Sequence, residues 1–71
     1  MPGAVPTSWP QLVGQPYFQA YQIITRERPD VHIEEHAEGE LVGPGPRDDT
    51  RVRLFINYFF ATVGRPAPAV G

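Results

Sequence analysis

The feature that most constrains this fold is the long stretch of chain between its two strand-like segments. Val31–Ile33 begins the first segment, and Arg51–Phe59 is the second, with apolar and polar residues alternating along it. Residues 37–50, which separate them, contain three glycines, two prolines and four acidic residues. Loops of this length are uncommon in compact domains and are usually functional or disordered. A tight hairpin is therefore excluded, whereas a parallel pair with the loop as crossover and an antiparallel pair with a wide loop both fit the sequence.

A helix is predicted before the first strand. Between Pro16 and Arg28, apolar residues recur at spacings of three and four, the period of an amphipathic helix: Tyr17, Ala20, Ile23 and Ile24. Proline suits the first turn of a helix, and Pro29 is expected to end it. We expect Ile24 and the only tryptophan, Trp9, to lie in the core.

Size and composition limit the class of protein. A chain of 71 residues without cysteine allows one domain with one core, and 41% hydrophobic residues suit a globular fold. The net charge of −2 argues against a nucleic-acid partner, and no apolar run approaches the roughly 20 residues of a membrane span. Residues 1–7 are predicted to be a flexible segment, and they lack the pattern of a signal peptide. A protein that is not exported and the processed form of an exported one both fit these residues.

Two histidines raise the possibility of a metal site or an enzyme. His32, Glu34 and His36 alternate onto one face of the first strand, but a further strong ligand is not evident. No serine lies near either histidine in the sequence, so a nucleophile–base pair is not expected. We therefore predict no metal, no cofactor and no catalytic residue.

Several motifs, taken in order, resemble the potato inhibitor I family. They are Ser8-Trp9-Pro10-Gln11-Leu12-Val13-Gly14, a helix ending at Pro29, Glu38-Gly39, Arg51-Val52-Arg53-Leu54-Phe55 and a final Ala69-Val70-Gly71. Each is weak alone, but a tryptophan motif, a loop and an Arg-x-Arg strand in this order are fairly specific. The resemblance covers essentially everything after Thr7, so residues 8–71 are identified as a domain of this type with its loop at 39–50.

The resemblance implies an α+β fold, a single small domain with one helix packed on a small mixed sheet. Its two main strands would run parallel and be joined by the long exposed loop. In the family that loop occupies the active site of a serine endopeptidase as a poor substrate. A loop already held in its bound shape loses little entropy on docking, and religation of a cut bond competes with release. The expected function is standard-mechanism inhibition of a subtilisin-, chymotrypsin- or elastase-like enzyme.

The resemblance also implies roles for individual residues. It places the scissile bond between Pro44 and Gly45, with Pro44 as the primary specificity residue, which suits a small or shallow pocket. Counting back from Arg51 instead gives Gly45–Pro46, which is less suitable because proline after the bond has no N–H. Arg51 and Arg53 match the two arginines that support the loop from below. The protease-binding segment would be Leu41, Val42, Gly43, Pro44, Gly45, Pro46 and Arg47.

The chain departs from the family pattern on both sides of that bond. The family usually has Thr before the primary residue and Asp or Glu after the bond, where this chain has Gly43 and Gly45. Glycine offers no side-chain acceptor, and each charge-assisted bond is worth about 1.5–3 kcal/mol. The neighbouring prolines would offset only about 0.4–1 kcal/mol each. Asp48 and Asp49 are candidate replacement partners for the arginines.

A loose loop leaves an alternative function open. The same fold would then serve as a non-inhibitory scaffold or protein-interaction module. Tyr58–Phe60 is an aromatic run without interleaved basic residues, so core or interface packing is expected rather than stacking on nucleic acid. We expect a monomer, with self-association through this run as the alternative.

Overall fold

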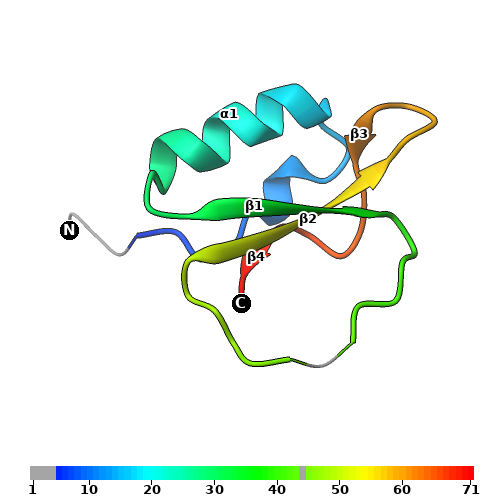
Figure 1. The fold of residues 1–71 in the computed structure, drawn as a ribbon. Helices are drawn as coiled ribbons and strands as arrows, with labels where there is room; N and C mark the ends of the chain where they lie inside the picture. Colours follow the sequence, from blue (N-terminus) through cyan, green and yellow to red (C-terminus); the bar gives the residue numbers. More distant parts are fainter. Residues whose placement is uncertain (1–4, 44) are drawn as a thin grey trace.

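The computed structural model describes residues 5–43 and 45–71 (Figure 1). Within these residues, one α-helix packs on a four-stranded sheet, which confirms the predicted α+β fold. The elements in chain order are η1 (Pro10–Leu12), α1 (Tyr17–Glu27), β1 (His32–Ala37), β2 (Arg51–Asn57), β3 (Thr62–Val63) and β4 (Ala69–Val70).

The sheet is built around β2. β1 runs parallel to β2 along its length, with His32 opposite Arg51 and Ala37 opposite Ile56. The long loop is therefore the crossover of a parallel pair, one of the two arrangements that the sequence allows. β3 and β4 both pair antiparallel with β2, along the edge that β1 leaves free. β2 is thus the central strand, and its side chains face both the core and the loop.

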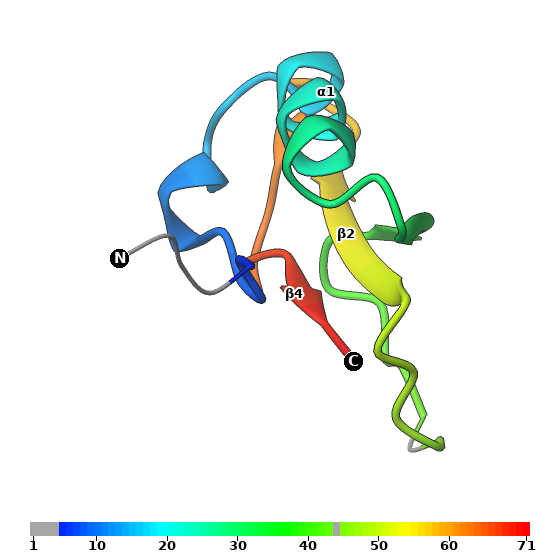
Figure 2. The same ribbon diagram turned by 90° about the vertical axis from the view of Figure 1, so that its left-hand side faces the viewer.

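The core lies between α1 and one face of the sheet. Figure 2 shows α1 above this face, while the loop extends away from the opposite side. Trp9 and Ile24 are fully buried, as predicted, and pack with Val52 and Leu54 of β2. The Trp9 Nε1–H donates a 2.8 Å hydrogen bond to Glu27 Oε1, which satisfies the buried indole. No helix in residues 5–43 or 45–71 has the length and apolarity needed to cross a membrane.

Arg28, just after α1, bonds to the neighbouring Asp30 and to two distant segments. Its Nε and Nη2 each donate a 2.8 Å bond to the carboxylate of Asp30, in the forked geometry that favours arginine. Its Nη1 donates to the Pro6 carbonyl at 3.0 Å, and Nη2 to the Asp49 carbonyl at 3.3 Å. The helix end is therefore tied to the end of the loop. Residues 1–4 of the segment predicted to be flexible lie outside the described residues, so its flexibility stays a prediction.

Candidate functional site

The candidate site is the loop between β1 and β2. Gly39 has φ +86°, a left-handed conformation that favours glycine, and the Glu40 N–H donates to the Ala37 carbonyl at 2.9 Å across this turn. Beyond it the chain has no regular secondary structure through Gly43, and Leu41 has 96% of its surface accessible. Pro44 lies outside the described residues, so its role as the primary residue and the scissile bond Pro44–Gly45 stay predictions.

The first limb of the loop, residues 40–43, is separated from the sheet. A cleft of about 470 Å³ separates it from β2 and the C-terminal segment. Its walls are mainly apolar and include Leu41, Val42, Phe55 and Val70, and its charged residues are Glu40 and Arg53. This part of the loop is not packed into the core, and the polar contacts of the loop lie at its two ends.

The two arginines of β2 have different partners. Arg51 reaches the loop itself, since its Nη2 donates to the Pro46 carbonyl at 3.2 Å, and its Nε donates to the Gly71 carbonyl at 2.8 Å. The Arg53 Nε lies 3.4 Å from Glu34 Oε1 on β1. This is the polar side-chain contact of Arg53 among the described residues. The geometry thus brings Arg51 to the loop backbone and Arg53 to a neighbouring strand.

The hypothesis that Asp48 and Asp49 replace the missing acceptors is wrong for the described contacts. Asp48 Oδ1 accepts bonds from the Thr50 N–H at 2.9 Å and the Thr50 hydroxyl at 2.7 Å, and these bonds lower the pKa of Asp48. Asp49 Oδ1 accepts a 2.8 Å bond from Arg47 Nε. Both short side chains are used within the turn before β2, so neither bonds to an arginine of that strand.

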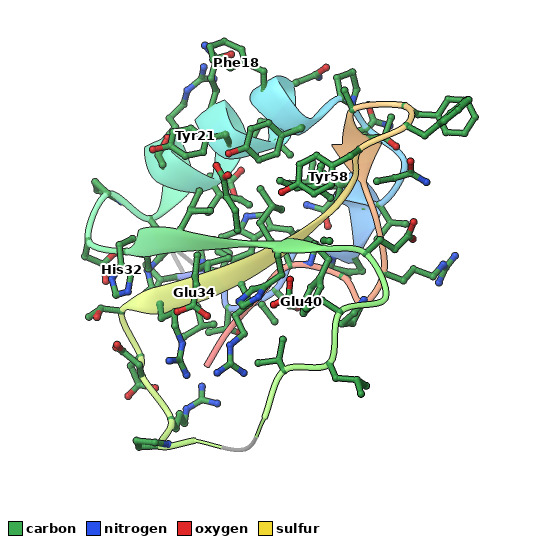
Figure 3. The ribbon with its side chains drawn as sticks, turned by 45° about the vertical axis from the view of Figure 1, so that its right-hand side comes forward. Phe18, Tyr21, His32, Glu34, Glu40 and Tyr58 are labelled. Carbon is green, nitrogen blue, oxygen red and sulfur yellow. The ribbon has the colours of Figure 1, made fainter. Side chains whose placement is uncertain are left out.

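A second polar group lies on the loop side of β1, and sequence reasoning missed its role. His36 Nδ1 is 2.7 Å from Glu40 Oε2, and Nε2 is 2.6 Å from Glu34 Oε1. Figure 3 shows the Glu34 and Glu40 side chains on this side of the strand. Alternation already placed Glu34 and His36 on one face, but Glu40 joins them only through the turn at Gly39. In the part of the chain that the structure describes, no group of three or more ligand side chains is arranged to hold a metal ion.

The aromatic run forms the turn between β2 and β3 and is exposed. Tyr58, Phe59 and Phe60 have 66%, 88% and 68% of their surfaces accessible. Asn57 Oδ1 accepts bonds from the backbone N–H groups of Phe59 at 3.0 Å and Phe60 at 3.2 Å. The turn is therefore not part of the core, and it lies at the end of the molecule away from the loop (Figures 1 and 2).

Replacing Arg51 with Lys is expected to destabilise the protein by about 1.5–3 kcal/mol, the value of a bond to a charged donor. Lysine lacks the planar fork that reaches Pro46 and Gly71 together. Urea unfolding measures the loss. Arg47→Lys is the matched control, because its ion pair with Asp49 is exposed and worth about 1 kcal/mol at most. Equal losses in the two variants would contradict the importance of Arg51.

The fold and the site together define a domain that presents an exposed crossover loop, held at its two ends on a small sheet. The sequence model of the potato inhibitor I family matches residues 2–71, and the chain belongs to this family. The recognition from sequence motifs is therefore confirmed, and with it the prediction that the chain is not an enzyme.

Two relatives show how far the similarity extends. Ethylene-responsive proteinase inhibitor 1 of Solanum lycopersicum is 38% identical over 68 residues, which is 92% of this chain. The chain spans 55% of the length of that curated relative. The crystal structure of bitter gourd trypsin inhibitor superposes with a TM-score of 0.79 at 31% identity, covering 96% of both chains.

Proposed function

We propose that this chain is a substrate-like inhibitor of serine endopeptidases, with Leu41 to Arg47 as the binding segment. The observation that carries the proposal is the exposed crossover loop held at both ends on the parallel pair β1–β2. Membership of the potato inhibitor I family and the names of both relatives support it.

The contacts at the loop ends suit the proposed mechanism. On one side of the proposed bond, Glu40 is held by His36 and by the Ala37 N–H. On the other side, the Pro46 carbonyl is held by Arg51. Val42 would then pair in extended form with the enzyme, and a cut chain would keep both new ends close enough to be rejoined. Arg51 supports the loop directly, and Arg53 does so through Glu34.

The predicted primary residue guides the choice of target. The solved relative is named as a trypsin inhibitor, but trypsin-like enzymes require a basic side chain in the primary pocket. Here Pro44 is proposed for that position, and the nearest basic residue in the loop, Arg47, lies beyond the proposed bond. We therefore propose a subtilisin- or elastase-like target with a small or shallow pocket.

Incubation with subtilisin-, elastase-, chymotrypsin- and trypsin-like enzymes tests the proposal. Residual activity measures inhibition, and mass spectrometry locates any cut. We expect weak inhibition of the first two enzymes with slow cleavage at Pro44–Gly45. Inhibition of the trypsin-like enzyme with a cut after Arg47 would contradict the assigned bond. An intact loop and no inhibition of any enzyme would contradict the function itself.

The exposed turn Tyr58–Phe60 favours a second candidate function. Three neighbouring aromatic side chains in water are typical of a surface that contacts another protein. A chain that inhibits no protease in the experiment above would be better described as an interaction module of the same fold.

A further inference from the structure

The His36 ring lies between two carboxylates and stacks on an aromatic ring. Its side chain is only 13% exposed, and each ring nitrogen lies against a carboxylate oxygen, Glu40 at 2.7 Å and Glu34 at 2.6 Å. The ring stacks on Phe55 of β2, with centroids 5.3 Å apart and planes inclined by 26°. The charged groups facing His36 are thus the two glutamates, and Arg51 and Arg53 of β2 approach it through Glu34.

These distances have a consequence for the proton count. Only the imidazolium form carries an N–H on both ring nitrogens, and the neutral form carries one. A neutral His36 would therefore turn a lone pair toward one of the two carboxylates. The observed arrangement is satisfied when His36 is charged.

His36 and its two glutamates connect the first limb of the loop to the second limb, residues 45–50. Glu40 belongs to the first limb, and its Oε1 accepts a 3.1 Å bond from the Ala37 N–H. Glu34 Oε2 lies 4.0 Å from Arg51 Nη1, and the guanidinium of Arg51 donates to the Pro46 carbonyl of the second limb. A continuous series of polar contacts therefore runs from Glu40 through His36, Glu34 and Arg51 to Pro46.

We infer that His36 is a positioning residue for the loop: as an imidazolium it holds the first limb to the arginines of β2, and its deprotonation releases that limb. Glu34 on β1 and Glu40 at the start of the loop thereby supply the side-chain acceptors that Gly43 and Gly45 lack. The consequence for inhibition rests on the proposed function, whereas the consequence for loop order does not.

The direction of the pH dependence follows from the pKa shifts of His36 and the two glutamates. Hydrogen bonds to Glu40 and Glu34 raise the pKa of His36 above 6.5, so its stabilising contribution is complete below 6.5 and is lost as the pH rises through the raised value. The bond from His36 lowers the pKa of each glutamate below 4.5, so their contribution is present above 4.5 and is lost at lower pH. Loop order is therefore expected to be greatest between pH 4.5 and pH 6.5.

Nuclear magnetic resonance of the free protein tests the inference without any protease. The His36 ring is expected to titrate above its ordinary value. Protection of the Ala37 and Glu40 amides, corrected for intrinsic exchange, is expected to fall about tenfold between pH 6 and pH 8.5, equivalent to one weak charge-assisted bond. His36→Gln should remove this pH dependence, and the matched His32→Gln should keep it.

Glu40→Gln provides a second variant that keeps the shape of the side chain. It should lower the pKa of His36 and reduce the change in amide protection. A His36 that titrates at or below its ordinary value, or a His36→Gln protein with the same profile as the native chain, would overturn the inference.

The functional arm measures dissociation from subtilisin at pH 6 and pH 8.5 by surface plasmon resonance. We expect the dissociation rate at pH 8.5 divided by the rate at pH 6 to be about tenfold larger for the native chain than for His36→Gln. Effects of pH on the enzyme itself cancel when these two ratios are compared. Equal ratios would overturn the role in inhibition. A chain that binds no protease but shows the expected amide profile would refute the proposed function and support the positioning of the loop by His36.

Discussion

Replacing Gly43 with Thr and Gly45 with Glu in a Pro44→Leu background is expected to slow dissociation of the protease complex by one to two orders of magnitude for each bond restored. Each new acceptor would receive a charge-assisted bond from a β2 arginine, worth about 1.5–3 kcal/mol. The structure has room for a Cβ at both positions, since a Cβ at either glycine meets no atom within 4 Å and neither has a left-handed φ. The gain should appear mainly as slower dissociation, because the docked geometry becomes the resting one.

The Pro44→Leu single variant is the control for this experiment. It separates a poor fit in the primary pocket from a loose loop, because it changes only the side chain that enters the enzyme. Dissociation rates of the single and triple variants from the same subtilisin give the effect of the acceptors. A triple variant that folds but neither inhibits nor is cut at 43–47 would show that the loop is not a protease-binding element.

Leu54→Ala is expected to have the largest effect on stability, about 2–5 kcal/mol in the free energy of unfolding. Leu54 is fully buried in the middle of β2, the strand that every other strand contacts. A small domain has about 5–15 kcal/mol of stability in total, so this loss is a large fraction of it. Urea unfolding followed by the fluorescence of Trp9, the only tryptophan, measures it.

Leu41→Ala is the matched control, since the same side chain is removed from a position that is 96% exposed. Its effect should stay within about 0.5 kcal/mol. A comparable loss at Leu41 would mean that the loop packs on the sheet in solution and that the cleft beneath it is closed.

Local pattern was sufficient to predict the main elements. The helix was predicted over Pro16–Arg28 and is observed at Tyr17–Glu27, because the apolar spacing and the flanking prolines are both local signals. Strand direction is not encoded in alternation, so periodicity left two pairings open, and the parallel one followed only from the family resemblance. β3 has two residues, Thr62–Val63, which is too short to show a period.

The site was harder to predict because its contacts depend on where the loop turns. Arg51 was expected beneath the loop and does reach it, but Arg53 contacts Glu34, a residue considered only as a metal ligand. The partner that completes the His36 group, Glu40, comes from a loop whose path is set by the left-handed turn at Gly39. Side-chain partners across such a turn cannot be paired by spacing in the sequence.

The position of the aromatic turn has a consequence for valency. Tyr58–Phe60 and the loop lie at opposite ends of the molecule, so an enzyme bound to the loop as proposed would leave the turn uncovered. Two copies joined through Phe59 would therefore present two loops facing outward. The dimer interface and the enzyme would then not compete for the same surface. Such a dimer would engage two protease molecules, or a dimeric protease with a gain in avidity set by the distance between its active sites.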